Sequence, residues 1–107
     1  MDVNTWRGLG EFHTIQGRSV FVVDTDPDNG QGKPALVLLH GYPTSSHDYC
    51  NVLEPLAERF RVIVHDHLGF GLSEKPRDYS YSIFEQTDVA LELWRKLELK
   101  SVRVFAH

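Results

Sequence analysis

The chain has 107 residues, of which 41% are hydrophobic, and its net charge is −4. This length fits one domain, and the hydrophobic fraction is sufficient to build a core. Acidic and basic residues are well mixed, so the charge gives no electrostatic reason to expect a nucleic acid or an anionic membrane as partner. No apolar stretch approaches the roughly 18 residues that a membrane-spanning helix needs.

The first twelve residues and the cysteine count concern the cellular compartment. Residues 1–12 contain neither a basic segment followed by an apolar one nor any other pattern of a secretory signal. Cys50 is the single cysteine, which excludes an internal disulfide framework and suits a reducing compartment. We therefore expect a cytoplasmic protein, and we interpret Cys50 as a small helix residue and not as a nucleophile.

The first third of the chain favours β-structure. Gly10 to Gln16 and Arg18 to Thr25 are two β-rich runs separated by Gly17, which predicts a hairpin with glycine at its tip. Asp26 to Lys33 is a polar loop dense in turn-forming residues. The apolar run Ala35 to Leu39 that follows has no polar interruption, which is typical of a strand buried on both faces of a parallel sheet.

The middle of the chain alternates between helix and strand patterns. A helix is expected to begin near His47, with one of Thr44, Ser45 and Ser46 as its cap. Pro55 must kink this helix or start a second short piece. Arg61 to Asp66 is predicted to be another strand, and residues 68–82 to be a long loop. The apolar positions of the expected helix are Val52, Leu53, Leu56, Ala57 and Phe60.

The last third predicts one long helix and one strand. Ser82 and Glu85 match the capping box, in which the two side chains satisfy each other's backbone donors. We assign Phe84 and Trp94 to the core and not to a cofactor site. Val102 to Ala106 is the predicted final strand. The apolar face expected for the helix is Ile83, Thr87, Ala90, Leu91, Trp94 and Leu97.

This order of elements predicts an α/β fold with a mostly parallel sheet, because strands that alternate with helices pair in parallel through crossovers. The final strand has no helix after it to cover its face, and in a doubly wound order it has a bare hydrogen-bonding edge. We expect residues 1–107 to be the amino-terminal part of a larger fold. The alternative is that a partner chain or self-association completes the sheet.

The turn His40-Gly41-Tyr42-Pro43, called the HGYP turn below, directly follows the buried strand. Gly41 allows close approach of a ligand to the backbone, and Pro43 confines Tyr42 to extended conformations. Open α/β sheets bind ligands at the carboxyl ends of their strands. We therefore predict that the backbone N–H of Tyr42 binds an oxyanion. The alternative is that the turn only connects a strand to a helix.

The histidines raise the question of a metal site. His65-Asp66-His67 is the tightest cluster, and we expect the two imidazoles to face apart if the strand persists. Zinc sites also need three or four ligands, so we predict no metal here.

Other polar residues are assigned structural roles. Asp66 is expected to accept backbone N–H bonds in the turn around Gly69 and Gly71 and not to act as an acid. Ser73 lies outside any Gly-x-Ser-x-Gly pattern, so it is interpreted as a turn residue. His47-Asp48 is assigned to helix capping and solvation.

Two motifs together resemble those of the α/β-hydrolase fold. They are residues 40–46, read HGYPTSS, and residues 66–76, read DHLGFGLSEKP. More narrowly, the chain resembles the group that holds epoxide hydrolases, haloalkane dehalogenases and mesoderm-specific transcript proteins. Residues 81–86, read YSIFEQ, are especially similar to the last of these. The resemblance extends from about Gly8 to His107.

The resemblance implies a cofactor-free hydrolase with a nucleophile, a histidine and an acid. Ala106-His107 resembles the approach to the nucleophile elbow, so the nucleophile would be the next residue. The acid, the catalytic histidine, the second oxyanion donor and the cap would also lie outside these 107 residues. What remains here is the Tyr42 N–H, positioned by His40, Gly41 and Pro43, and the resemblance implies a cis Tyr42–Pro43 bond.

One position departs from part of this group. Dehalogenases of this type resemble His-Gly-Asn-Pro at the turn, whereas this chain has Tyr42, which argues against dehalogenation. We therefore expect a hydrolase of an epoxide or an ester, a small-molecule substrate, of which the 107 residues alone are inactive. The alternative is a non-catalytic homologue or truncated form that acts as an interaction module through Val102–Ala106.

Overall fold

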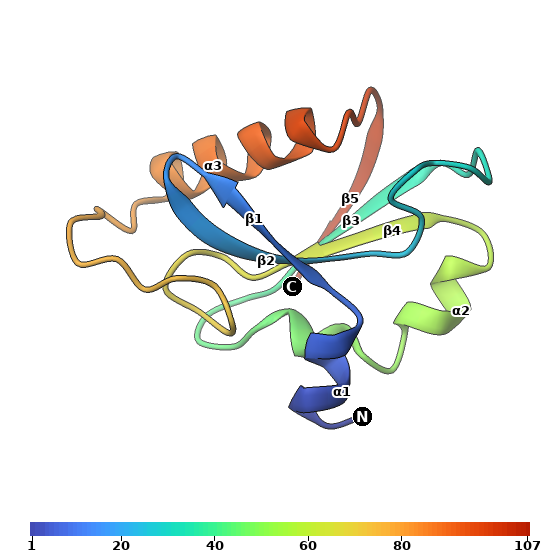
Figure 1. Ribbon diagram of the computed structural model, residues 1–107, viewed down its shortest axis with the longest axis horizontal. Coiled ribbons are helices and arrows are strands. Elements are labelled where there is room, and N and C mark those ends of the chain that lie inside the picture. The colour runs from blue at the N-terminus through green and yellow to red at the C-terminus, as the bar shows by residue number, and fades with distance from the viewer.

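In the computed structural model, which describes residues 1–107, five strands form one sheet in the order β1-β2-β4-β3-β5 (Figure 1). β1 pairs antiparallel with β2, and β2 pairs antiparallel with β4. β4, β3 and β5 run parallel, which confirms the predicted α/β class with its leading hairpin. The strands are β1 (Glu11–Ile15), β2 (Arg18–Asp24), β3 (Ala35–Leu39), β4 (Arg61–His65) and β5 (Val102–Ala106).

The β1–β2 hairpin closes through a two-residue turn. Ile15 is paired with Arg18, and the two residues between them both have positive φ, 53° for Gln16 and 75° for Gly17. Positive φ at both central residues matches the twist of antiparallel strands, and glycine adopts it without steric cost. The predicted hairpin with Gly17 at its tip is confirmed.

Helices cover both faces of the sheet (Figure 1). α3 (Ile83–Lys96) lies over one face, and the short elements α1 (Val3–Gly8), η1 (Ser46–Tyr49, a 3-10 helix) and α2 (Leu53–Ala57) lie on the other side. Each face has its own hydrophobic core. The core on the α3 side is Ile15, Val20, Val22, Ala35, Val37, Ile63, Leu68, Tyr79, Val89 and Leu93. The opposite core is Trp6, Phe21, Val23, Leu38, Tyr49, Leu53, Val62 and Val64.

The helix expected near His47 is divided into two short helices, η1 and α2. This matches one of the two predicted effects of Pro55, the start of a second short piece. Ser45 caps the first piece, because its Oγ accepts the N–H of His47 at 3.3 Å. Pro55 is the third residue of α2, where a missing N–H costs no intrahelical bond. The His47 imidazole reaches the carbonyl oxygen of Met1 at 2.7 Å and so contacts the amino terminus.

α3 turns a different face to the sheet than the sequence predicted. Val89, Ala90 and Leu93 are the buried residues of the helix, whereas Ile83 and Phe84 are both 82% exposed. The assignment of Phe84 to the core was therefore wrong, as were those of three other positions of the expected face, Ile83, Thr87 and Leu91, which are exposed. The helix packs on the sheet through Val89 and Leu93, so only part of the predicted apolar face is directed toward the sheet.

The capping box at the start of α3 is only half formed. Ser82 Oγ accepts the N–H of Glu85 at 3.1 Å, as predicted. The N–H of Ser82 donates to Ser80 Oγ at 3.1 Å instead of to the Glu85 side chain. A serine two residues before the cap thus takes the place of the glutamate in satisfying this donor.

β5 is the edge strand predicted from the sequence. It pairs only with β3, and Arg103 to Ala106 are exposed. Phe105 touches the rest of the fold through its ring, which lies 6.3 Å from that of Tyr49. The outer hydrogen-bonding edge of β5 is therefore bare.

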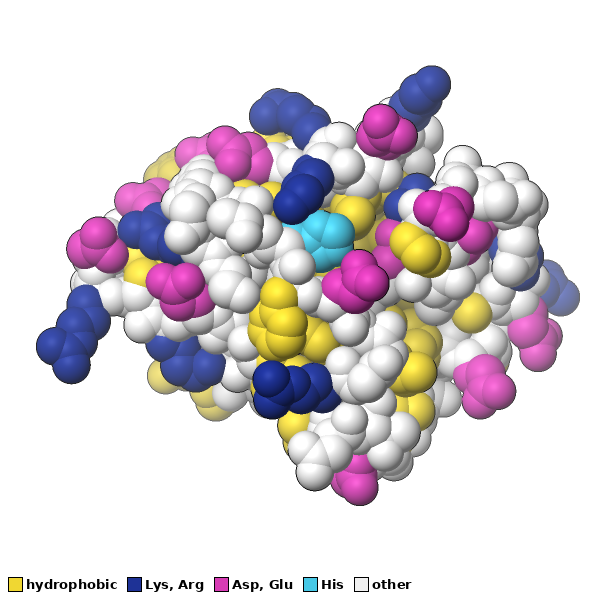
Figure 2. All heavy atoms as spheres, in the orientation of Figure 1, with side chains coloured by type: hydrophobic (Ala, Val, Ile, Leu, Met, Phe, Trp, Pro, Cys, Tyr) yellow, Lys and Arg dark blue, Asp and Glu magenta, His cyan; other side chains and the backbone are white.

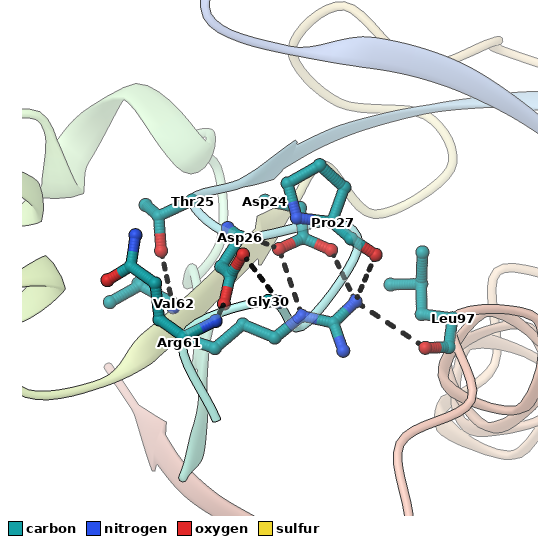
Figure 3. Close-up of polar contacts among 9 residues, drawn as sticks. Asp24, Thr25, Asp26, Pro27, Gly30, Arg61, Val62 and Leu97 are labelled. Atoms are coloured by element: carbon teal, nitrogen blue, oxygen red, sulfur yellow. Dashed lines mark hydrogen bonds and ion pairs between the residues drawn. The ribbon is translucent and has the colours of Figure 1, made fainter. Parts of the chain in front are cut away.

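An ion pair secures the amino end of β4 (Figure 3). The Arg61 guanidinium donates to both carboxylate oxygens of Asp24, at 3.1 and 2.7 Å. It also reaches the carbonyl oxygens of Pro27 and Leu97, each at 3.4 Å. The hydrogen bond to Asp24 raises the pKa of Arg61 and outweighs the opposing effect of burial. Arg61 thereby joins β2, the loop after it and the end of α3.

The surface carries charges of both signs. Figure 2 shows acidic and basic side chains interspersed around one face of the molecule, with apolar side chains between them. None of the helices has the length and apolar character that crossing a membrane requires.

Candidate functional site

The HGYP turn, the turn after β4 and the end of β5 meet at the carboxyl end of the parallel strands. Each of β3, β4 and β5 stops there: Leu39 is paired with His65 on one side and with Ala106 on the other. Parallel pairing aligns these strand ends, and the loops that leave them therefore lie together. All the site residues predicted from the sequence belong to these three segments.

Gly41 fixes the shape of the HGYP turn through its carbonyl oxygen. This oxygen accepts the N–H and the Oγ1 hydroxyl of Thr44, both at 3.0 Å. The Tyr42–Pro43 bond is cis, as the resemblance implied. The Tyr42 side chain is 87% exposed and meets Phe70 edge-on, with ring centroids 5.8 Å apart.

The backbone N–H of Tyr42 makes no hydrogen bond within the chain. Most backbone N–H groups in folded proteins are paired, so an unpaired donor in a rigid turn is open to a ligand or to water. This is the group that the sequence predicted as an oxyanion donor.

Gly41 also lets the end of β5 come close. The His107 N–H donates to the Leu39 carbonyl oxygen at 3.1 Å, and the His107 carbonyl oxygen lies where a Cβ on Gly41 would be. Any side chain at position 41 would collide with this backbone oxygen. His107, the predicted approach to the elbow, is thus adjacent to the HGYP turn.

His40 is 4% exposed, and both of its ring nitrogens have partners. Nδ1 lies 2.9 Å from the Gly41 carbonyl oxygen, and Nε2 accepts the backbone N–H of His67 at 3.0 Å. The His67 ring in turn places Nε2 3.1 Å from the His40 carbonyl oxygen. Sequence reasoning missed this pairing of His40 with His67, because a contact between residues 27 apart leaves no local pattern.

The strand predicted for Arg61 to Asp66 ends one residue earlier, at His65, so Asp66 lies just beyond β4, where it is buried. Its carboxylate accepts the N–H of Ser46 at 2.7 Å and that of Leu72 at 2.8 Å. Gly71 has φ +53°, and a Cβ there would strike this carboxylate. Ser73 donates its hydroxyl to the Asp66 carbonyl oxygen at 2.7 Å and accepts the Phe21 N–H at 2.9 Å.

Gly69, the other predicted turn glycine, has φ +92°. Its N–H donates to the carbonyl oxygen of Glu74 at 2.8 Å, and a Cβ there would meet the ring of Tyr81. The loop from Gly69 to Glu74 therefore closes on itself and is covered by Tyr81.

The expectation that His65 and His67 face apart was wrong. Residues two apart on a strand lie on the same face, and the two ring centroids are 5.3 Å apart. Burial, followed by the neighbouring His67 and His40, lowers the pKa of His65 to about 3. The structure contains no group of three or more His, Cys, Asp or Glu side chains that could hold a metal ion.

A hollow of about 400 Å³ opens beside the HGYP turn, between it and α3. Two of the residues that line it carry a buried polar atom without a hydrogen-bond partner, Gln86 Oε1 and Trp94 Nε1. The exposed stripe of α3 that the sequence assigned to the core lines this hollow. The lining residues are Leu39, His40, Gly41, Tyr42, His67, Phe70, Tyr81, Ile83, Gln86, Thr87, Ala90, Leu91 and Trp94.

Known proteins are similar to this chain in sequence or in fold. Mesoderm-specific transcript protein of Mus musculus is 44% identical over 103 residues, which cover 95% of this chain and 30% of that protein. Haloalkane dehalogenase 2 of Mycobacterium bovis is 42% identical over 78 residues, 73% of this chain and 25% of that protein. The crystal structure of haloalkane dehalogenase DbeA from Bradyrhizobium elkani aligns with a TM-score of 0.82 at 30% identity, covering 92% of this chain and 32% of that chain.

The chain therefore spans less than a third of the length of these relatives. A family model described as the alpha/beta hydrolase fold matches residues 34–107, which is more than half of the chain. From this match, and from the sheet order and strand-end turns described above, we conclude that this protein belongs to the α/β-hydrolase fold family.

Proposed function

We propose that these residues supply the oxyanion-binding turn of a hydrolase that acts on an epoxide or an ester through a nucleophile, a histidine and an acid. The backbone N–H of Tyr42 is the donor, held by His40, Gly41 and Pro43. The nucleophile would follow His107 in the whole protein. No cofactor or metal takes part in this proposal.

The observation that carries the proposal is the unpaired N–H of Tyr42 beside the end of β5. Tyr42 lies between Gly41, whose carbonyl oxygen is held by Thr44, and Pro43. The His107 backbone lies against Gly41. A nucleophile on the residue after His107 would therefore lie near the Tyr42 N–H. A preorganised N–H close to a nucleophile is what stabilisation of an oxyanion requires.

A single oxyanion donor contributes only part of the catalysis of a hydrolase. Removing one oxyanion donor typically costs about 2.7–4 kcal/mol of transition-state stabilisation. A donor without a nucleophile performs no chemistry, so we expect this chain by itself to be inactive. An aspartate as nucleophile would form an alkyl-enzyme and favour epoxides, whereas a serine would form an acyl-enzyme and favour esters.

The substrate class is narrowed by Tyr42 itself. Two of the relatives are named haloalkane dehalogenases. Dehalogenases resemble His-Gly-Asn-Pro at this turn, with the asparagine side chain holding the halide, and the Tyr42 side chain offers no amide for that purpose. We therefore place epoxides and esters ahead of haloalkanes.

The test exchanges the Tyr42 N–H group for an oxygen atom, which cannot donate. In the whole protein, Tyr42 is replaced by its α-hydroxy acid, so that an ester oxygen takes the place of the N–H while the side chain stays. We expect kcat on epoxides or aryl esters to fall by about 10²–10³. Tyr42→Phe is the matched control and should keep full activity, because it retains the N–H. An ester variant as active as the control would refute the proposal, as would activity that survives loss of the nucleophile.

A second candidate function rests on β5. Its bare edge and exposed Val104 and Phe105 favour addition of a partner strand. In an antiparallel pair of two β5 strands centred on Val104, Arg103 would lie opposite Phe105, which suits a cation–π contact. Sedimentation velocity tests this: we expect a dimer that Val104→Lys converts to monomer, and a monomer at all concentrations would exclude self-association.

A further inference from the structure

We propose that His67 is a positioning residue for the HGYP turn, and that protonation of His40 breaks one of the two hydrogen bonds between these residues. The effect of His67 on catalysis rests on the proposed function. The hydrogen bonds between His40 and His67 are independent of it. Two hydrogen bonds between the same two residues form the hold, which we call the histidine clamp: His67 N–H to His40 Nε2, and His67 Nε2 to the His40 carbonyl oxygen.

The chemistry of the partners fixes the tautomers in this clamp. A backbone N–H can only donate, so Nε2 of His40 must be its unprotonated acceptor. The single ring proton of His40 is then on Nδ1 and donates to the Gly41 carbonyl oxygen. A carbonyl oxygen can only accept, so Nε2 of His67 carries a proton. The clamp therefore exists only while His40 is neutral.

The clamp acts on the turn through the backbone. The His67 imidazole holds the carbonyl oxygen of His40, which belongs to the peptide unit that leads into Gly41. His40 Nδ1 holds the next carbonyl oxygen along, that of Gly41. Two successive carbonyl groups before Tyr42 are thus fixed by imidazole donors, and the direction of the Tyr42 N–H follows from them.

The His40 ring has one nitrogen left that can accept a second proton. It must enter at Nε2, where it would face the N–H of His67 donor against donor, and one bond of the clamp would be lost. The two rings lie 4.3 Å apart between centroids, so a charge on one also raises the cost of a charge on the other.

Few charged groups face the clamp. From β4 and its turn they are His65, His67 and Asp66, whose carboxylate is already occupied by two backbone N–H groups. Beside the turn stand the Tyr42 phenol and, from the end of β5, His107. The residues of α3 that line the hollow are all uncharged. No free carboxylate is therefore in contact with His40, and burial and His40 lower the pKa of His67.

The first test is direct observation of the tautomers by long-range ¹H–¹⁵N NMR of the whole protein labelled with ¹⁵N-histidine. At pH 8 we expect a protonated Nδ1 and a bare Nε2 in His40, and a protonated Nε2 in His67. As the pH falls, protonation of His40 Nε2 should coincide with the loss of protection of the His67 amide. A protonated Nε2 on His40 at pH 8, or a His67 amide that does not respond to this titration, would overturn the proposal.

The second test separates positioning from folding. His67→Leu removes the ring donor, His67→Gln supplies an amide donor in its place, and His13→Leu on β1 is a control for loss of a histidine elsewhere. Loss of one hydrogen bond should speed hydrogen exchange of the Thr44 amide about five- to tenfold in His67→Leu, with recovery in His67→Gln and no change in His13→Leu. Equal exchange in all three would refute the positioning role.

Activity in the whole protein distinguishes this inference from the proposed function. There, His67→Leu should lower kcat about five- to tenfold with KM unchanged and shift the acid limb of the pH profile, while His67→Gln keeps kcat. If the Tyr42 ester has no effect on kcat but the tautomers are as expected, the clamp stands and the oxyanion role fails. If the ester abolishes activity and the tautomers differ, the reverse holds.

Discussion

The two ends of the parallel strands are held by contacts of different kinds. At the amino end, Arg61 and Asp24 form a buried ion pair in which the guanidinium donates to both carboxylate oxygens (Figure 3). At the carboxyl end, neutral imidazoles and backbone groups form the network, and the Tyr42 N–H is left without a partner. The polar side chains of Arg61 and Asp24 at the amino end are therefore used to hold the fold together. At the carboxyl end the Tyr42 N–H remains free to donate, which is a condition for binding a ligand there.

The largest effect is expected from breaking the ion pair of the amino end. Arg61→Met leaves the Asp24 carboxylate buried without its partner, which should lower the free energy of unfolding by about 3–5 kcal/mol in urea denaturation. Asp78→Ala is the control: it breaks the Arg18–Asp78 pair, in which Asp78 is 90% exposed, and should cost less than about 1 kcal/mol. Equal costs for the two variants would contradict the contrast between buried and exposed pairs.

The next effect concerns the buried carboxylate of the carboxyl end. Asp66→Ala deprives the N–H groups of Ser46 and Leu72 of their acceptor, and two unpaired buried donors should cost about 2–4 kcal/mol in urea denaturation. Asp66→Asn retains one acceptor oxygen and should lose about half as much. If both variants were as stable as the parent chain, Asp66 would not organise these turns.

Acid should lower the free energy of unfolding through His65, at the carboxyl end of β4. The pKa of His65 in the folded chain is about 3, below its ordinary 6.5, because of burial and then of His67 and His40. The folded state therefore binds fewer protons than the unfolded state below pH 6.5, and stability falls as the pH is lowered through this window. The slope is about 1.4 kcal/mol per pH unit for one such group. Urea denaturation from pH 8 to pH 5 measures it, and His65→Leu should remove that part of the slope.

The smallest effect compares two glycines with positive φ. Gly71→Ala meets the Asp66 carboxylate, whereas Gly17→Ala at the hairpin tip has no atom within 4 Å of the new Cβ. Both variants incur the cost of a left-handed alanine, about 1 kcal/mol, and only Gly71→Ala adds a collision, for about 1–2 kcal/mol more. Thermal denaturation of the two variants gives the difference directly, and equal melting temperatures would show that the turn at Asp66 yields easily.

The strands were predictable because β3 is a short apolar run between turn residues, and because β1 and β2 are β-rich runs on either side of Gly17. The hairpin tip at Gly17 and the buried run Ala35–Leu39 have local signals that suffice. α1 was missed, since Trp6 is its one buried residue and so leaves no periodic pattern. Its cap at Asp2, which accepts the Thr5 N–H at 2.8 Å, was the available signal.

The face of α3 was harder to predict, because periodicity shows that a stripe is apolar without saying what covers it. Ile83 and Leu91 belong to a stripe that lines the hollow, while Val89 and Leu93 lie on the sheet. In the site, the residues of the HGYP turn follow from their own sequence. The partner of His40 does not, because the choice of His67 depends on where β4 ends.

The order of the strands in the sheet has a consequence for how the chain is made. β4 lies between β2 and β3, both of which leave the ribosome before it. The hairpin and β3 therefore emerge with an empty place between them, which is filled only when residues 61–65 have been synthesised. Non-local pairing requires loop closure before its contacts can form, so β2 and β3 are joined into one sheet only once β4 is available.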